Sequence, residues 1–227
     1  MVDEWRASGS LGEGRIVLTD LRGCGINQDW PQEKIFTLKD LANDCLQIIS
    51  DLKTDTIDIV GHSLGGLIAL QMMLMAPERF HKAFLLCPVG AKGVIFDPGM
   101  YDIFKQMASN PDITRTVILS TIDNHQNLDP HLKDQISEDA FKAVKGTGSS
   151  VLEMLKKVDI SNELRTCQIP TMIVHGAKDQ IIPVADSLNL KQIMPKVELL
   201  LPEDVGHCWN IENPPAFTEC VRSWLKN

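Results

Sequence analysis

The chain has 227 residues, of which 44% are hydrophobic and 23% charged, and its formal net charge is −8 with a pI near 5.2. These proportions are typical of a globular protein with one sizeable core, and the acidic balance argues against nucleic acid or anionic membranes as partners. No stretch resembles a signal peptide or an apolar membrane span, so we expect a cytoplasmic protein. Six cysteines without metal-ligand spacing predict reduced thiols, and nothing in the sequence indicates a metal or a cofactor.

The first half of the chain alternates strand and helix patterns. Arg15–Thr19 predicts a strand, and the glycine-rich stretch Asp20–Gly25 is typical of the turn that leaves it. Thr37 and Asp40 form a capping-box pattern for a helix. Its apolar residues recur at three- and four-residue steps along one face: Leu38, Leu41, Cys45, Ile48 and Leu52.

The segment from Ile57 to Met75 carries the clearest motif. A β-branched run ends in Gly61-His62-Ser63-Leu64-Gly65, and an apolar helical pattern follows at once from Leu67. Strand, sharp turn and helix form the context of a nucleophile elbow. We expect side chains at Gly61 and Gly65 to collide in so tight a turn, which would hold Ser63 in a strained backbone conformation. The alternative is an ordinary glycine-rich turn with an incidental serine.

Alternation of strand and helix stops after the next predicted strand, Ala83–Cys87. Four helical patterns follow, at residues 100–109, 112–122, 132–145 and 150–158, separated by Pro, Gly and Asn signals. We interpret residues 90–165 as a helical cap inserted into a core made of residues 1–89 and 166–227.

The strand pattern returns at Thr171–His175 and again at Val197–Leu201, with helices predicted at Pro183–Met194 and Pro214–Leu225. Strands that alternate with crossover helices predict an α/β fold with a mostly parallel, doubly wound sheet. In such sheets the functional residues gather in the loops beyond the carboxyl ends of the strands.

A serine hydroxyl needs a general base, and six histidines are available. His207 is the best candidate because it stands in a loop after a strand and late in the chain. His175, at a strand end before a glycine turn, is a second candidate. His62 lies inside the elbow turn, where it cannot bend back onto Ser63.

Asp179 is the best candidate for the acid that would orient this histidine, because it lies in the turn after a strand. The chain order Ser63, Asp179, His207 is also the order found with nucleophile elbows of this kind. Glu203 and Asp204 are closer in sequence to the histidine but share its loop.

Together these motifs resemble the α/β-hydrolase superfamily. The resemblance rests on Gly61–Gly66, His175–Asp179 and Gly206-His207, and on Thr19–Gly25, which is similar to the superfamily's D-x-R-G-x-G turn. It implies a Ser63–His207–Asp179 triad, the Leu64 amide as one oxyanion-hole donor, and hydrolysis of an ester-like bond through an acyl-serine.

The chain departs from this resemblance at its start. In the superfamily a strand with a His-Gly-type loop precedes the D-x-R-G turn and supplies the second oxyanion amide, and this chain begins too late to contain it. Either the sequence is N-terminally shortened, which would leave a gap beside the elbow strand, or the Arg15–Thr19 strand has moved over. The alternative function is therefore a non-catalytic or impaired hydrolase-like binding protein.

The sequence indicates the substrate only by class. We expect a small-molecule carboxylic ester, a lactone or a related acyl compound, and leave the oligomeric state open. The candidate substrate-binding residues are Val89, Tyr101, Phe104 and Trp209. The simpler interpretation of the apolar cap residues around Tyr101 and Phe104 is that they form the cap's own core.

Overall fold

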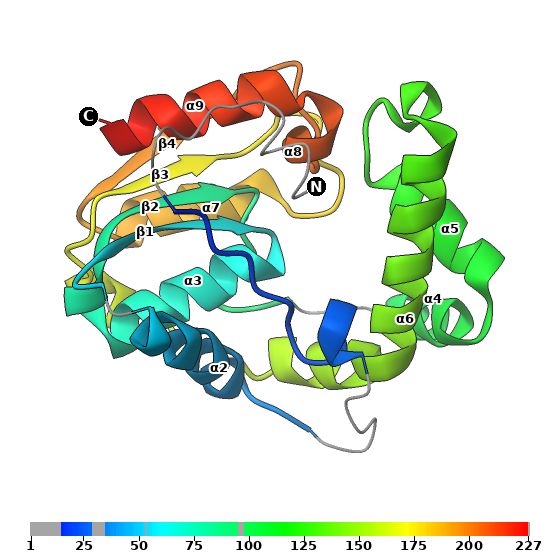
Figure 1. Ribbon diagram of the computed structural model, residues 1–227, viewed down its shortest axis with the longest axis horizontal. Helices are drawn as coiled ribbons and strands as arrows, with labels where there is room; N and C mark the ends of the chain where they lie inside the picture. Colours follow the sequence, from blue (N-terminus) through cyan, green and yellow to red (C-terminus); the bar gives the residue numbers. More distant parts are fainter. Residues whose placement is uncertain (1–14, 29–34, 53, 95–97, 227) are drawn as a thin grey trace.

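Four parallel strands form the sheet: β1 (Ile57–His62), β2 (Phe80–Leu86), β3 (Thr171–Val174) and β4 (Val197–Leu200). Within residues 15–28, 35–52, 54–94 and 98–226, which the computed structural model describes, they lie in the order β1-β2-β3-β4. Consecutive strands are neighbours, so each connection crosses over the sheet and all carboxyl ends lie at one edge. The predicted parallel α/β sheet is confirmed, and Figure 1 shows its layers.

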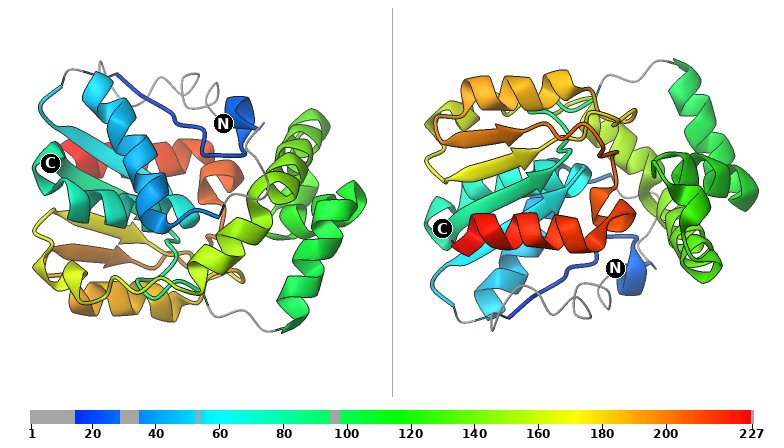
Figure 2. Two further views of the ribbon diagram at one scale, coloured as in Figure 1. Left: turned by 90° about the horizontal axis from the view of Figure 1, so that it is seen from below. Right: turned by 90° about the horizontal axis from the view of Figure 1, so that it is seen from above.

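Helices cover both faces of the sheet (Figures 1 and 2). On one face α2 (Leu38–Asp51), α3 (Leu64–Met75) and α7 (Val184–Ile193) bury their apolar side chains in the larger core. On the other face α9 (Pro214–Lys226) closes a smaller core through Phe217 and Val221. The remaining helices and turns are α4 (Pro98–Ser109), α5 (Pro111–Ser120), α6 (Pro130–Leu155), α8 (Trp209–Glu212), η1 (Gly25–Asn27), η2 (Pro77–Arg79), η3 (His125–Asn127) and η4 (Glu163–Thr166).

Helix α2 begins where the capping-box pattern predicts. The Thr37 hydroxyl accepts the Asp40 N–H, and the Asp40 carboxylate accepts the Thr37 N–H at 2.7 Å. The reciprocal bonds satisfy amides that the first helical turn leaves without partners. One detail of the predicted apolar face is wrong, because Ile49 is buried whereas Ile48 remains 37% exposed.

Helices α4, α5 and the first part of α6 form a layer beyond the carboxyl ends of the strands (Figure 1). The end of α6 joins the larger core through Met154 and Leu155. All three helices lie inside the predicted insertion, whose exact boundaries stay a prediction. The two helices predicted at 132–145 and 150–158 are one helix, α6. Its two glycines do not break it, because both are buried in close contacts: Gly146 and Thr147 pack against the turn that contains Gly23, and Gly148 faces Phe104 of α4. Close packing here outweighs the low helix propensity of glycine.

The predicted strand at Arg15–Thr19 is wrong, because residues 15–20 have no regular secondary structure. Cavities of about 620 and 300 Å³, both lined by Val17 and Leu18 and by residues of β1, lie between this segment and the sheet. Without a strand beside it, a β-branched sequence has no ladder to join, and Val17 stays 41% exposed. Among the described residues, no helix is both long and apolar enough to cross a membrane.

Candidate active site

Ser63 lies between the end of β1 and the first turn of α3, at the carboxyl edge of the sheet. Its backbone has φ 53° and ψ −120°, a conformation that L-residues rarely adopt. The surrounding backbone maintains this conformation: the Ser63 N–H donates to Leu86 O at 3.0 Å, and Ser63 O accepts N–H groups from Gly66 at 2.9 Å and Val89 at 3.2 Å. The predicted strained turn is therefore present at Ser63.

The structure tests the prediction that side chains at Gly61 and Gly65 would collide in the turn. A Cβ on Gly61 would stand 2.6 Å from Gly65 O, so a side chain is excluded there. A Cβ on Gly65 would meet nothing within 4 Å, and the predicted collision at that position is wrong. The second crowded glycine is Gly66, where a Cβ would lie 2.7 Å from the Cβ of Pro88. Gly65 faces open space because the turn closes on the strand β2 side.

Asp179 lies in the loop after β3, and its side chain is fully buried. Its Oδ1 accepts the N–H groups of Ile181 at 2.7 Å and Ile182 at 3.0 Å, and its Oδ2 lies 2.8 Å from His207 Nδ1. Burial alone would raise the pKa of this carboxyl, but the hydrogen bond and charge of His207 and the two amides outweigh it and lower the pKa to about 2. Asp179 is thus held as a carboxylate.

His207 follows β4 in a loop, and 6% of its side chain is exposed. Because a carboxylate can only accept, the Nδ1–H of His207 donates to Asp179. In the neutral ring Nε2 is then the free acceptor, which is the tautomer that a general base requires. Within the described part of the chain, no hydrogen bond joins the Ser63 hydroxyl to His207.

His62 contacts the loop of His207 rather than Ser63. Its Nε2 lies 2.9 Å from His207 O, so Nε2–H donates to that carbonyl, and the two rings are 4.7 Å apart at their centroids. Burial, supported by the charge of His207, lowers the pKa of His62 to about 3. A neutral His62 therefore supports the histidine loop, a contact that sequence reasoning missed.

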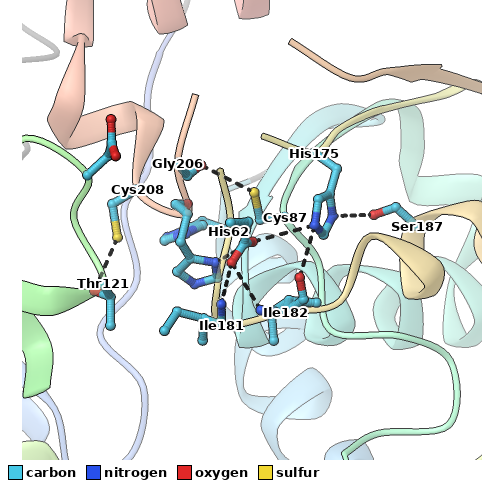
Figure 3. Close-up of polar contacts among 12 residues, drawn as sticks. His62, Cys87, Thr121, His175, Ile181, Ile182, Ser187, Gly206 and Cys208 are labelled. Carbon is cyan, nitrogen blue, oxygen red and sulfur yellow. Dashed lines mark hydrogen bonds and ion pairs between the residues drawn. The ribbon is translucent and has the colours of Figure 1, made fainter. Parts of the chain in front are cut away.

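Of the other candidates for base and acid, His175 lies beside the acid itself, with its Nε2 3.6 Å from Asp179 Oδ2. His175 is buried, with Nε2–H donating to Ile182 O at 3.0 Å and Nδ1 accepting from the Ser187 hydroxyl at 2.8 Å (Figure 3). Both ring nitrogens are therefore engaged in holding the acid loop, and burial lowers the pKa of His175. Asp204 is fully exposed, with a carboxylate oxygen 4.0 Å from Lys178 Nζ.

The four candidate substrate-binding residues are not brought to one place. Val89 is buried beside the elbow, and its N–H donates to Ser63 O. Phe104 of α4 lines a cavity of about 170 Å³ together with Leu64. The Tyr101 ring lies under the ammonium group of Lys156, 4.0 Å from its centroid. Trp209 packs edge-on against Phe217 in the core under α9.

Cys87, Asp179 and His207 are the described residues whose atoms could hold a metal ion, since their possible ligand atoms lie within 4.8 Å of one another. The Asp179 and His207 atoms already bind each other, and the Cys87 thiol donates to Gly206 O at 3.7 Å (Figure 3). Burial raises the pKa of the Cys87 thiol, which disfavours the thiolate that metals bind. The donor set therefore fits an Asp–His pair better than a metal centre.

Comparison with known proteins identifies the family of the chain. A family model described as alpha/beta hydrolase fold matches residues 13–214, and the chain belongs to this family. The chain is 25% identical over 224 residues to a 2-hydroxy-6-oxo-2,4-heptadienoate hydrolase of Pseudomonas putida, covering 93% of this chain and 78% of that protein. It is 24% identical over 226 residues to a pimeloyl-[acyl-carrier protein] methyl ester esterase of Nitrosomonas europaea, covering 91% and 83%.

Solved structures confirm the fold. An esterase from Exiguobacterium antarcticum has a TM-score of 0.83 over 99% of this chain and 86% of its own, at 21% identity. A likeness at that identity bears on the architecture alone. The relatives named above are hydrolases, which supports hydrolytic activity for this chain.

Proposed function

We propose that this member of the α/β-hydrolase fold family is a serine hydrolase that cleaves a small-molecule carboxylic ester, lactone or related acyl bond. The observation that carries the proposal is the buried Asp179–His207 pair, 2.8 Å apart, at the same sheet edge as the strained Ser63. An oriented imidazole and a partly exposed serine hydroxyl at an elbow are the parts that acyl transfer to serine requires. Hydrolase relatives add independent support.

In the proposed reaction Ser63 Oγ attacks the acyl carbon while His207 Nε2 accepts the hydroxyl proton. The negative oxygen of the tetrahedral intermediate accepts the Leu64 N–H, a first-turn amide of α3 that has no acceptor within its own helix. His207 then protonates the leaving alcohol, and a water molecule repeats the sequence to release the carboxylic acid and restore Ser63. Asp179 keeps its charge throughout and stabilises the imidazolium.

The cavity beside Leu64 supports an acyl chain as the bound group. It measures about 170 Å³, and its lining is mostly apolar: Leu21, Leu64, Phe104, Val144 and Val151. Apolar pockets discriminate chain length, each methylene contributing about 1–3 kcal/mol. We expect Val151→Phe to lower kcat/KM for hexanoyl and longer esters by about tenfold or more while acetyl esters react as before.

A fluorophosphonate probe tests the serine mechanism directly. Wild-type protein should be labelled, and Ser63→Ala should abolish labelling without unfolding the chain. Asp179→Asn should lower kcat by about 10³–10⁴-fold because it removes the charge that fixes the His207 tautomer. Asp204→Asn, which alters a fully exposed carboxylate of the neighbouring loop, is the matched control and should leave kcat unchanged. An unchanged rate in Asp179→Asn would contradict the assignment of the acid.

The second candidate is a hydrolase-like binding protein without turnover. The observation that favours it is the lack of a hydrogen bond between the Ser63 hydroxyl and His207 in the described residues. Such bonds often tighten only when substrate is present, so the fluorophosphonate probe is the test that separates the two functions. Folded wild-type protein that the probe fails to label would favour the binding protein.

A further inference from the structure

Glu212, the last residue of α8, places its carboxylate against the loop that carries His207. Its Oε2 accepts the Gly206 N–H at 2.8 Å, and its Oε1 accepts the Cys208 N–H at 3.1 Å. These two amides stand on either side of His207. The contact also explains the glycine before the histidine, because a Cβ on Gly206 would lie 2.4 Å from Glu212 Oε1.

The same carboxylate reaches the layer of α4, α5 and α6. Its Oε1 accepts a third amide, the Asp123 N–H, at 3.1 Å, and the Asn124 side-chain amide donates to Glu212 O at 3.1 Å. We call residues 121–124, which follow α5, the insertion corner. This corner is thus fastened to the end of α8 by two hydrogen bonds.

Two further contacts join the insertion corner to the loops of the site. The Thr121 hydroxyl lies 3.7 Å from Cys208 Sγ, next to His207 in the chain (Figure 3). Lys178, next to Asp179 in the chain, donates to the Asp123 carboxylate at 3.1 Å, with both side chains partly exposed. The corner therefore contacts both the base loop and the acid loop, and Glu212 is the residue that bonds the corner and the base loop at once.

The position of the His207 ring depends on its backbone. Asp179 holds Nδ1 and His62 holds the carbonyl group, but neither contacts the amides of Gly206 and Cys208. A carboxylate that accepts several N–H groups makes charge-assisted bonds, which are stronger and shorter than those between neutral groups. Small displacements of a catalytic group have large effects on rate, so the support of this loop matters for catalysis.

We propose that Glu212 is a positioning residue that holds His207 in place and couples the position of His207 to that of the insertion corner. The proposal rests on the proposed role of His207 as the base. Removal of the carboxylate releases three amides at once, two at the base loop and one at the insertion corner. The loop and the corner then loosen together, and Ser63 loses a well-placed base.

Glu212→Ala and Glu212→Gln test this proposal, with rates expressed per Ser63 that the fluorophosphonate probe titrates. We expect Glu212→Ala to lower kcat at least tenfold with KM within about twofold of wild type. Glu212→Gln keeps one acceptor oxygen and should retain an intermediate rate, which also covers the case in which the alanine variant fails to fold. Glu203→Gln, which changes the glutamate in the loop between β4 and α8, is the matched control and should behave as wild type.

Two readouts do not depend on turnover. Hydrogen exchange at the amides of residues 121–124 and 206–208 should become faster in both Glu212 variants and stay unchanged in Glu203→Gln. The low-field proton resonance of the His207–Asp179 hydrogen bond should broaden in the same two variants. Unchanged exchange at the insertion corner would overturn the coupling, and an unchanged resonance with unchanged kcat would overturn the positioning role. If the wild-type protein shows no turnover, the proposed function fails. The hydrogen-exchange and resonance measurements still test whether Glu212 positions His207 and couples it to the insertion corner.

Discussion

The depressed pKa of His62 predicts a specific loss of stability in mild acid. The unfolded chain binds a proton at this histidine near pH 6.5, whereas the folded protein resists protonation down to about pH 3. The contribution of His62 to stability is therefore complete above pH 6.5 and is lost as the pH falls toward 3. At pH 6.5 the unfolded imidazole is half protonated, so the fall from pH 6.5 to 4.5 corresponds to about 2 kcal/mol, an upper value because the ring has partial contact with solvent.

His62→Gln isolates this contribution because glutamine keeps an N–H donor for His207 O but does not titrate. Urea unfolding at pH 6.5 and 4.5, followed by circular dichroism, should give a fall in unfolding free energy that is about 2 kcal/mol smaller in the variant. Asp179, with a pKa of about 2, loses its contribution only below about pH 4, and His175 is present in both proteins.

Ser63→Ala, which retains His62, is the matched control and should lose stability over this range as wild type does. Equal losses in wild type and His62→Gln would refute the reasoning, since they would show that His62 carries the same proton in both states.

Two further predictions concern strain and buried polar groups. Ser63→Gly should raise the unfolding free energy by about 1 kcal/mol in urea titrations, because glycine adopts a φ of 53° without strain. The same variant should lose probe labelling because it has no hydroxyl. A variant less stable than wild type would contradict strain at Ser63. Ser187→Ala should lower the unfolding free energy by about 1–3 kcal/mol, because the buried Nδ1 of His175 loses its donor. Ser161→Ala, at an exposed hydroxyl, is its control, and equal stabilities of the two variants would contradict that account.

Local chemistry in the sequence was sufficient to predict most of the architecture. The capping box at Thr37, the apolar helix after Ser63 and the β-branched runs are signals that act within a few residues of the chain. A strand also needs a neighbouring strand with which to form hydrogen bonds, and the sequence does not show whether one is present. Arg15–Thr19 has the composition of a strand, but cavities separate it from β1. The glycines of α6 likewise mark close packing, of Gly146 against Gly23 and of Gly148 against Phe104, rather than a helix end.

For the candidate site, the sequence by itself determined the residue types and the loops that carry Ser63, Asp179 and His207, since parallel strands bring their carboxyl ends to one edge. Only the tertiary structure decided the rest: that Gly66 rather than Gly65 is crowded, that His62 supports the base loop, and that Glu212 joins that loop to the insertion corner. These contacts link residues whose partners are set by how whole elements pack. No pattern within one segment encodes contacts between residues that are far apart in the chain. These contacts form only when the sheet and the insertion have folded against each other.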